Sequence, residues 1–318
     1  MKLVCLDAFS VYPANDSEWS RFADIADVEV YDRTAENEIV ERLAGAEMAL
    51  TNKVPLNAET IAKLPDLKYI GVLATGYNIV DVKAAEAAGI TVTNIPAYST
   101  KSVTQQVFAL LLALTNRVEE YAAGVSDGKW SRCPDFTYRE REWTELAGKT
   151  MGIVGFGNIG SSVAAVSAAM GMRIVLYTSK NQSELPEGYV KATLDELFAA
   201  SDVVSLHCPL TEDTRNLVDS RRLSLMKPSA ILINTARGPL VDEQALADAL
   251  DNGKIYAAGL DVLVNEPPRH DNPLLKAKNC FITPHIAWAS TEARSRLFKI
   301  ALQNAAAFAQ GYPQNVVK

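Results

Sequence analysis

The sequence predicts an α/β protein with two doubly wound domains, each built on a parallel sheet. Short β-branched runs alternate with helix-like segments along most of the chain, which is the pattern of successive β-α-β units. The length of 318 residues exceeds what one ordinary domain needs, so two separate hydrophobic cores are expected. A stretch rich in Pro, Ser and Thr at 95–102 interrupts the alternation and indicates a domain boundary.

The first part of the chain alternates in this way up to about Ile95. Polar-apolar segments such as TAENEIVERLAG and NAETIAKLP place apolar residues three and four positions apart, as amphipathic helices do. The runs between them are predicted strands of one parallel sheet. These predicted strands are Leu3–Leu6, Val28–Tyr31, Met48–Thr51, Tyr69–Leu73 and Thr91–Asn94.

Two unusual segments follow the boundary. Residues 102–124, SVTQQVFALLLALTNRVEEYAAG, have helix-forming types and are apolar on most faces. Such a helix is buried on more than one side, so we expect it to pack on its own domain and on another domain or chain, and a dimer contact is predicted. Residues 127–143, DGKWSRCPDFTYREREW, have no strong period and are predicted to form a loop that wraps a partner subunit.

From Lys149 onward the alternation is sharper, and further strands are predicted with helical segments between them. The last stretch, 291–311, is an amphipathic helix that ends at a glycine. We expect this helix to fold back onto the first domain. The predicted strands are Thr150–Val154, Arg173–Tyr177, Val203–Leu206, Ala230–Ile233, Ile255–Leu260 and Phe281–Thr283.

Composition and charge argue against several classes of function. A net charge of -7 disfavours a nucleic-acid partner, whose phosphate backbone requires an excess of basic residues. The N-terminus lacks the pattern of a signal peptide, and no apolar run is long enough for a membrane helix, so a cytosolic (cytoplasmic) protein without a membrane partner is expected. Cys5, Cys133, Cys208 and Cys280 are dispersed without metal-ligand spacing, and we interpret them as reduced, mostly buried residues.

The most specific motif is GFGNIG, which places Gly155, Gly157 and Gly160 at the spacing GxGxxG. It lies between an apolar strand and a helix of small residues, with a further strand after it. In a Rossmann-like, dinucleotide-binding unit, these glycines form the tight turn, admit the pyrophosphate to the backbone, and let the helix pack on the strand. The phosphates would bind at the helix N-terminus, where unpaired amides and the helix dipole favour negative charge.

The end of the next predicted strand determines which dinucleotide fits. An acidic residue about 20 positions after the glycines usually binds the adenosine ribose hydroxyls, but this chain has Thr178, Ser179 and Lys180 there. A carboxylate would repel the 2′-phosphate of NADP, whereas these side chains can donate hydrogen bonds to it. We therefore predict NADP use, beside NAD or in preference to it; the alternative is that Lys180 is an ordinary solvated lysine.

Charged residues follow three later strands, at the edge where ligands bind in open α/β sheets. Arg237 follows one strand, Asp261 and Glu266 follow the next, and His285 follows a third. These types suit hydride transfer to a ketone. Arginine binds a carboxylate and polarises the carbonyl, and histidine, with an ordinary pKa of about 6.5, donates the proton. Glu266 is the candidate carboxylate that orients the imidazole and favours its protonated form.

Each of these residues also has a purely structural interpretation. Arg237 could form a surface ion pair, Glu266 could end a turn, and His285 could cap backbone groups at a strand end. Of the other histidines, His207 is predicted to be structural, with a place near the cofactor as the alternative, and His270 is predicted to lie in an exposed loop. The combination of these types beside a dinucleotide motif favours the functional interpretation.

The ordered motifs GFGNIG, SLHCPLT, INTARG, LDVLVNEPP and TPHIAW resemble those of the D-isomer-specific 2-hydroxyacid dehydrogenases, over nearly the whole chain. Within that family, YIGVLATGYNIVD and TPHIAWASTEAR are most similar to glycerate dehydrogenases, also called hydroxypyruvate reductases. The resemblance implies reduction of a small 2-keto acid, hydroxypyruvate or glyoxylate first, to the D-2-hydroxy acid with NAD(P)H. It also implies a dinucleotide-binding domain of 99–288 and a discontinuous substrate domain of 1–98 and 289–318.

The resemblance also implies roles for single residues. Arg237 would bind the substrate carboxylate and carbonyl, His285 would be the acid/base, and Glu266 would pair with it. The other implied contacts are Ala74, Thr75 and Gly76 with the substrate; Asn158 and Ile159, beside the motif glycines Gly155, Gly157 and Gly160, with the pyrophosphate; Thr235, Ala236 and Asp261 with the nicotinamide; and Cys208, Pro209, His285 and Ala287 elsewhere along the cofactor. Thr178, Ser179 and Lys180 depart from the family's acidic residue and remain the predicted contacts of a 2′-phosphate.

Two rival interpretations stay open at this stage. One is a different enzyme on the same scaffold, such as a phosphoglycerate, formate or phosphonate dehydrogenase. The other is a non-catalytic dinucleotide sensor that binds protein partners, which would not need Arg237 together with Glu266 and His285. We predict a homodimeric reductase, and a turnover assay separates it from a sensor.

Overall fold

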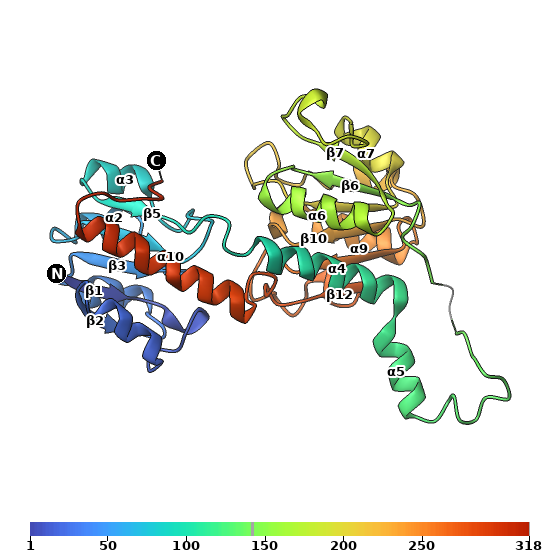
Figure 1. Ribbon diagram of the computed structural model, residues 1–318, viewed down its shortest axis with the longest axis horizontal. Coiled ribbons are helices and arrows are strands. Elements are labelled where there is room, and N and C mark those ends of the chain that lie inside the picture. The colour runs from blue at the N-terminus through green and yellow to red at the C-terminus, as the bar shows by residue number, and fades with distance from the viewer. Residues whose placement is uncertain (141–142, 318) are drawn as a thin grey trace. The chain divides into compact units, whose positions relative to one another are not determined.

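The computed structural model describes residues 1–140 and 143–317. Contacts divide the chain into two compact units, unit 1 (Met1–Ser99 with Ala289–Lys318) and unit 2 (Thr100–Trp288). The first boundary differs by one residue from the division expected from the sequence. Within the described residues, the sheet of unit 1 has five strands and that of unit 2 has seven (Figure 1). All the strand pairs are parallel, so the predicted α/β class with parallel sheets is confirmed.

Unit 1 has the strand order β2-β1-β3-β4-β5. Its strands are short and, apart from the edge strand β2, mostly buried, and the C-terminal helix α10 packs on β4. Phe298 of α10 lies between the rings of Tyr12, Trp19 and Phe22 at centroid distances of 5.3, 5.1 and 5.4 Å. The elements are β1 (Lys2–Cys5), β2 (Asp27–Val30), α1 (Ile39–Arg42), β3 (Met48–Thr51), α2 (Ala58–Ala62), β4 (Tyr69–Val72), α3 (Val82–Ala87), β5 (Thr91–Thr93) and α10 (Thr291–Ala309).

Unit 2 contains the larger sheet, with the order β12-β11-β10-β9-β6-β7-β8. Its shortest strand, β8 (Val190–Lys191), was not predicted, because two exposed residues carry no periodic signal. The other elements are α4 (Thr100–Asn116), α5 (Val118–Ser126), β6 (Thr150–Val154), α6 (Asn158–Ala169), β7 (Arg173–Tyr177), α7 (Leu194–Ala200), β9 (Val203–Leu206), α8 (Ser220–Leu225), β10 (Ile231–Asn234), α9 (Glu243–Asp251), β11 (Ala257–Leu260) and β12 (Cys280–Ile282).

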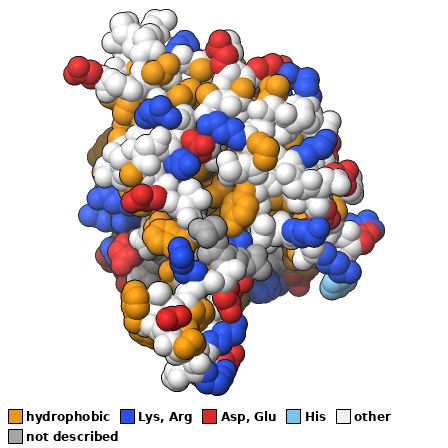
Figure 2. Space-filling view, turned by 90° about the vertical axis from the view of Figure 1, so that its right-hand side faces the viewer, with side chains coloured by type: hydrophobic (Ala, Val, Ile, Leu, Met, Phe, Trp, Pro, Cys, Tyr) orange, Lys and Arg blue, Asp and Glu red, His pale blue; other side chains and the backbone are white. Residues whose placement is uncertain are grey.

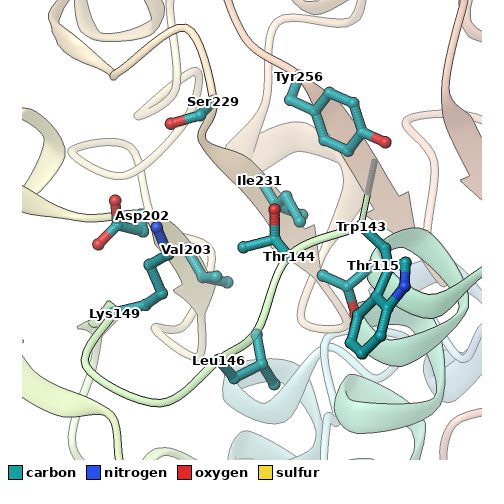
Figure 3. A pocket seen from close by; sticks show the side chains of 10 residues that line it. All are labelled: Thr115, Trp143, Thr144, Leu146, Lys149, Asp202, Val203, Ser229, Ile231 and Tyr256. Carbon is teal, nitrogen blue, oxygen red and sulfur yellow. The ribbon is translucent and has the colours of Figure 1, made fainter. Parts of the chain in front are cut away.

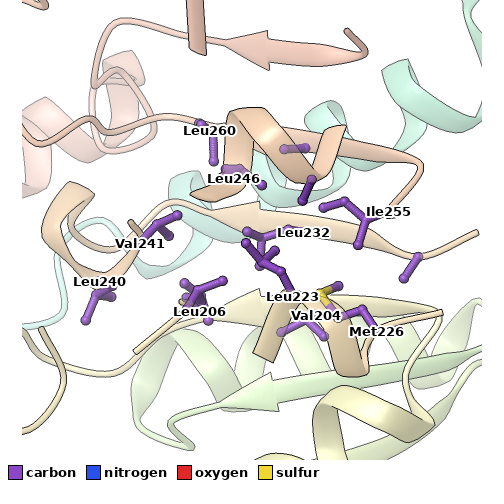
Figure 4. Close-up of a cluster of buried hydrophobic side chains, with 14 of the residues drawn as sticks. Val204, Leu206, Leu223, Met226, Leu232, Leu240, Val241, Leu246, Ile255 and Leu260 are labelled. Atoms are coloured by element: carbon purple, nitrogen blue, oxygen red, sulfur yellow. The ribbon is translucent and has the colours of Figure 1, made fainter. Parts of the chain in front are cut away.

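Helices cover both faces of the larger sheet. Helices α4 and α6 pack against each other and on one face, whereas α7, α8 and α9 form the opposite layer (Figure 1). Each layer has its own buried cluster. Figure 4 shows the second layer, where Val204 and Leu206 of β9 lie beside Leu232 of β10. A sheet buried on both faces explains why its strands are continuous apolar runs in the sequence.

The single helix predicted over 102–124 is two helices. Arg117 adopts a left-handed conformation with φ 51° and separates α4 from α5. Its buried guanidinium donates to Tyr256 Oη at 3.0 Å and to Asn279 Oδ1 at 3.1 Å, and these tertiary contacts fix the break. Helix α4 is buried along much of its length. In α5, all of whose residues are described, only Gly124 is buried within this chain, so the predicted contact of this segment with another domain or chain stays a prediction.

The predicted loop at 127–143 is partly described. Over 127–140 and at Trp143 it forms no helix or strand, which agrees with the prediction. Residues 141–142 of that prediction lie outside the described residues.

Two compositional expectations can be compared with the structure. All four cysteines are free, but only Cys5 is fully buried and the other three are half-buried, so the expectation of mostly buried cysteines is wrong. A half-buried thiol still contributes apolar surface to packing. Over the described part of the chain, no helix combines the length and the apolar character needed to cross a membrane.

Candidate active site

The strands of unit 2 end at one common edge of the larger sheet. Because neighbouring parallel strands are in register, the residues that follow them leave the sheet on the same side. The strand order reverses between β6 and β9, and ligands in doubly wound sheets bind at such a switch point beyond the carboxyl ends. The residues paired at this edge are Val154 with Tyr177 and Leu206, and Leu260 with Asn234 and Ile282.

The glycine turn after β6 is tightly packed except at one position. Gly155 has φ 96°, and a Cβ there would come within 2.8 Å of the backbone of His207 and Cys208. A Cβ on Gly160 would lie 2.0 Å from Gly155 O, so the helix can approach the turn only without side chains. Around Gly157, which caps α6, no described atom lies within 4 Å of such a Cβ. The turn therefore leaves space at the helix N-terminus that fits a pyrophosphate.

Two lysines lie beside this turn at the end of β7. The ammonium of Lys180 lies 5.2 Å from the centroid of the Phe156 ring, inside the glycine motif. Lys191 of β8 donates from Nζ to Lys180 O at 2.6 Å. The Thr178 hydroxyl accepts from the Lys180 amide at 3.2 Å. The region that would meet the adenosine ribose is therefore basic and hydroxyl-rich.

The turn after β10 presents Arg237 on a fixed backbone. The buried side chain of Asn234 accepts from the Ala236 amide at 3.0 Å and donates to Arg237 O at 2.9 Å. Thr235 Oγ1 is buried and, within the described residues, has no hydrogen-bond partner. A buried hydroxyl without a partner is costly, and a bound nicotinamide beside Thr235 and Ala236 would relieve this cost. The residues present therefore fit the dinucleotide.

Gly238 brings the Arg237 turn against the loop that carries Glu266. A Cβ on Gly238 would lie 2.0 Å from the Leu263 carbonyl and 2.4 Å from Val264 N, so only glycine permits this approach. The Leu263 amide in turn donates to Glu266 Oε1 at 3.2 Å. The two loops are therefore packed together at the same sheet edge.

His285 and Glu266 form the ion-pair geometry expected from the sequence. His285 Nδ1 lies 2.6 Å from Glu266 Oε2, and the two side chains are 27% and 36% exposed. Because an ionised carboxylate only accepts hydrogen bonds, Nδ1 carries the proton of this contact. Nε2 is then the nitrogen left to exchange a proton with a ligand.

Asp261 is 1% exposed, and its carbonyl accepts from the His285 amide at 2.8 Å. Its carboxylate accepts from Thr283 Oγ1 at 2.5 Å, from the Ile286 amide at 3.0 Å and from the Ala287 amide at 2.8 Å. Burial raises the pKa of Asp261 above its usual range, and these hydrogen bonds only partly offset that effect. Asp261 is thus held by three donors from the segment that carries His285.

Comparison with known proteins decides the family. A family model described as D-isomer specific 2-hydroxyacid dehydrogenase, NAD binding domain, matches residues 108–287. The chain belongs to the D-isomer-specific 2-hydroxyacid dehydrogenase family. It is accordingly an NAD(P)-dependent oxidoreductase, and the resemblance found in the sequence motifs is confirmed.

Three similar proteins illustrate the relationship. Hydroxypyruvate reductase of Blautia hydrogenotrophica is 44% identical over 321 residues, which cover 100% of this chain and 99% of that protein. Glycerate dehydrogenase of Methylorubrum extorquens is 46% identical over 283 residues and 88% of each chain. Among solved structures, an acyclic imino acid reductase in complex with NADPH and D-Arg superimposes with a TM-score of 0.88, at 32% identity and 100% coverage of both chains.

His207, predicted to be structural, and Cys208, a predicted neighbour of the cofactor, follow β9. His207 Nε2 lies 2.8 Å from Ser205 Oγ, and burial lowers the pKa of His207 to about 3, so this histidine is neutral near pH 7. Burial also raises the pKa of the Cys208 thiol to about 11, which makes it a poor nucleophile. Their backbone packs on Gly155. Pro209 and His270 are exposed.

The predicted substrate turn belongs to unit 1, directly after β4. The Thr75 hydroxyl donates to Ile95 O at 2.8 Å, and Asn94 Nδ2 donates to Thr75 O at 2.7 Å. The Ile95 amide donates to Ala74 O at 3.0 Å. Ala74, Thr75 and Gly76 therefore form a turn that is braced by the segment after β5.

The dehydrogenase also has a pocket at the opposite, amino edge of the larger sheet. Its volume is about 50 Å³, and none of the predicted site residues lines it. Figure 3 shows Lys149 and Asp202 on one side of it and Trp143 on the other. Asp202 accepts from Lys227 Nζ at 2.9 Å and from the Thr150 amide at 2.8 Å.

Some residues of interest escaped the sequence analysis. Lys191 lies on a strand too short to predict, and Thr283 was assigned only as a strand end. Ser102 and Gln106 contact the His285 turn from a helix that is 177 or more positions away in the chain. A single sequence holds no signal for such long-range pairs.

Proposed function

We propose that this dehydrogenase transfers a hydride from NAD(P)H to C2 of a small 2-keto acid, hydroxypyruvate or glyoxylate first, and forms D-glycerate or glycolate. The same site would catalyse the reverse oxidation. The observation that carries the proposal is the 2.6 Å contact between His285 and Glu266, at the same sheet edge as Arg237 and the glycine turn. The names of two relatives, hydroxypyruvate reductase and glycerate dehydrogenase, support the choice of substrate.

The proposed roles follow from the chemistry of the side chains. Bound NAD(P)H supplies the hydride. The guanidinium of Arg237 binds the substrate carboxylate through parallel hydrogen bonds and polarises the adjacent carbonyl. His285 donates a proton from Nε2 to the carbonyl oxygen as negative charge develops there. Glu266 holds Nδ1–H, so the imidazole keeps one orientation during the transfer.

We assign unit 2 as the dinucleotide-binding domain and unit 1 as the substrate domain. The turn of Ala74, Thr75 and Gly76 supports the second assignment, because hydrogen bonds brace it at the carboxyl end of β4. In this proposal its backbone amides bind the substrate carboxylate. Gly157, Asn158 and Ile159 provide the amides for the pyrophosphate at the start of α6.

We also propose that NADP is accepted. Thr178, Ser179 and Lys180 replace the usual acidic residue, and Lys191 adds a second ammonium beside Lys180. Steady-state rates with NADPH and NADH test this. Lys191→Ala should lower kcat/KM for NADPH about tenfold, the value of one charge-assisted hydrogen bond, and leave that for NADH nearly unchanged. Lys254→Ala is a control at the other edge of the sheet. A strong preference of the wild type for NADH would contradict the proposal.

We propose that the enzyme is a homodimer through α4, α5 and the segment after α5. Val118, Trp130 and Phe136 are 66%, 52% and 89% exposed, and Figure 2 shows hydrophobic side chains among the charged ones on this face. An apolar groove between α4 and α6 adds to this surface. A second copy of the chain would bury both. Sedimentation should give twice the 34.5 kDa chain mass, and Phe136→Asp should shift it towards monomer, whereas Phe9→Asp should not.

The substrate proposal is tested by a panel of 2-keto acids with both cofactors. We expect hydroxypyruvate or glyoxylate to give the highest kcat/KM, above pyruvate and phosphohydroxypyruvate. A higher value for phosphohydroxypyruvate, or oxidation of formate or phosphonate, would assign one of the related enzymes instead. If none of these compounds were turned over, the result would favour the interpretation of the chain as a dinucleotide sensor.

A further inference from the structure

The turn that carries His285 is held by two backbone hydrogen bonds of the His285 amide. The His285 amide donates to Asp261 O at 2.8 Å and to Thr283 O at 2.9 Å. His285 has φ 53°, in the left-handed region that residues other than glycine rarely adopt. Such a conformation persists only where the surroundings determine it. The neighbours of this turn therefore decide where the imidazole lies.

The carboxylate of Asp261 is the centre of these surroundings. It accepts from the Thr283 hydroxyl on one side of His285 and from the amides of Ile286 and Ala287 on the other. One buried group therefore fixes the chain both before and after the histidine. Removal of any of these donors would free part of the turn.

Helix α4 braces the same turn from the side. Gln106 Nε2 donates to Thr283 Oγ1 at 3.2 Å, and Ser102 Oγ donates to Ala287 O at 2.6 Å. Ser102 and Gln106 are four positions apart, so they share one face of the helix. Because the Gln106 amide nitrogen only donates, the Thr283 hydroxyl accepts from it and directs its own proton to Asp261.

We propose that Ser102, Gln106 and Thr283 are positioning residues for proton transfer by His285. They act through the Asp261 carboxylate and the backbone of the turn, which together set the direction of Nε2. The inference rests on the proposed role of His285 as the acid/base. A catalytic group displaced by about 1 Å can lose about 100-fold in rate, so a loosened turn has a measurable cost.

Thr283→Val tests the network with little change of side-chain shape. We expect kcat to fall about tenfold, in line with one lost hydrogen bond, while KM for NAD(P)H stays within about twofold. Thr283→Ser keeps the hydroxyl and should restore most of the rate. Thr115→Val is the matched control, because Thr115 is a buried threonine at the far end of α4 whose hydroxyl donates to Leu111 O at 3.0 Å. It should leave kcat unchanged.

The double variant of His285→Ala and Thr283→Val distinguishes a loss of His285 positioning from a general loss of structure at the site. With no imidazole to orient, adding Thr283→Val should change the residual rate by less than about twofold, the non-additivity expected of residues that act as a unit. A tenfold loss in that background would overturn the inference. Wild-type kcat for Thr283→Val would also overturn it.

Gln106→Glu covers the case in which Thr283→Val does not fold. A carboxylate facing Thr283 Oγ1 would take the hydroxyl proton away from Asp261, so kcat should fall about tenfold. Wild-type kcat in Gln106→Glu would contradict the network. An active His285→Ala enzyme would refute the proposed proton donor. An inactive His285→Ala enzyme, together with fully active Thr283→Val and Gln106→Glu enzymes, would refute only the positioning network.

Discussion

The two edges of the larger sheet each hold a buried or half-buried aspartate, and their surroundings differ. At the amino edge, Asp202 pairs with Lys227 and accepts from the Thr150 amide. Burial acts to raise the pKa of Asp202, but these two hydrogen bonds outweigh it and the pKa lies below its usual range. At the carboxyl edge, Asp261 is held by a hydroxyl and two amides, and burial raises its pKa.

This difference shows where the molecule tolerates unfavourable groups. The carboxyl edge combines a raised carboxylate pKa, a histidine in a left-handed conformation and the buried Thr235 hydroxyl without a described partner. Strain and perturbed ionisation of this kind cluster at functional sites. The amino edge has a pocket, but the Asp202 carboxylate beside it is ion-paired with Lys227. We therefore propose the carboxyl edge, and not this pocket, as the functional one.

The largest expected effect comes from removing the proposed proton donor at the carboxyl edge. His285→Ala should lower kcat/KM for the 2-keto acid by about 10²- to 10⁴-fold, the usual contribution of a general acid. Arg237→Ala should also abolish most activity, because the carboxylate loses its bidentate partner. Steady-state kinetics measures both, and circular dichroism should show a wild-type fold. A fully active Arg237→Ala enzyme would refute the assignment of this edge.

A substitution at the amino edge should affect stability and spare catalysis. Asp202→Ala leaves the buried Thr150 amide and Lys227 without their partner, so the free energy of unfolding should fall by about 1–3 kcal/mol. Urea denaturation measures this loss. kcat/KM should stay at the wild-type value, with Asp202→Asn intermediate in stability. A large loss of kcat/KM in folded Asp202→Ala would contradict the proposal that catalysis takes place at the carboxyl edge alone.

The effect that is smallest near pH 7 concerns His207 and grows as the pH falls. Its pKa is about 3 in the folded chain and about 6.5 when unfolded, so below pH 6.5 the unfolded state binds one more proton. The free energy of unfolding should therefore fall as pH decreases from 6.5 towards 3, by about 1.4 kcal/mol per pH unit for this group. His207→Gln keeps a polar group near Ser205 and should have a shallower slope between pH 6 and pH 4. Equal slopes in the two proteins would contradict a neutral His207 in the folded chain.

Local sequence patterns predicted most of the sheet and the rare side chains at its carboxyl edge. Strands β6 and β9 match their predicted bounds because buried β-branched runs have sharp ends. Arg117 broke a predicted helix because its conformation depends on Tyr256 and Asn279, far along the chain. His285 and Glu266 were found because histidine and glutamate are unusual after apolar strands. Their supporting hydrogen bonds join distant segments, and no local pattern reveals such contacts.

The most direct test is a crystal structure of the enzyme with NADPH and oxamate, a 2-keto acid analogue that does not accept hydride. We expect the dinucleotide along the carboxyl edge with its pyrophosphate at Gly157, and the oxamate carbonyl within hydrogen-bond distance of His285 Nε2 and the Arg237 guanidinium. Density for oxamate in the amino-edge pocket of Figure 3, or a carbonyl that meets neither side chain, would contradict the account.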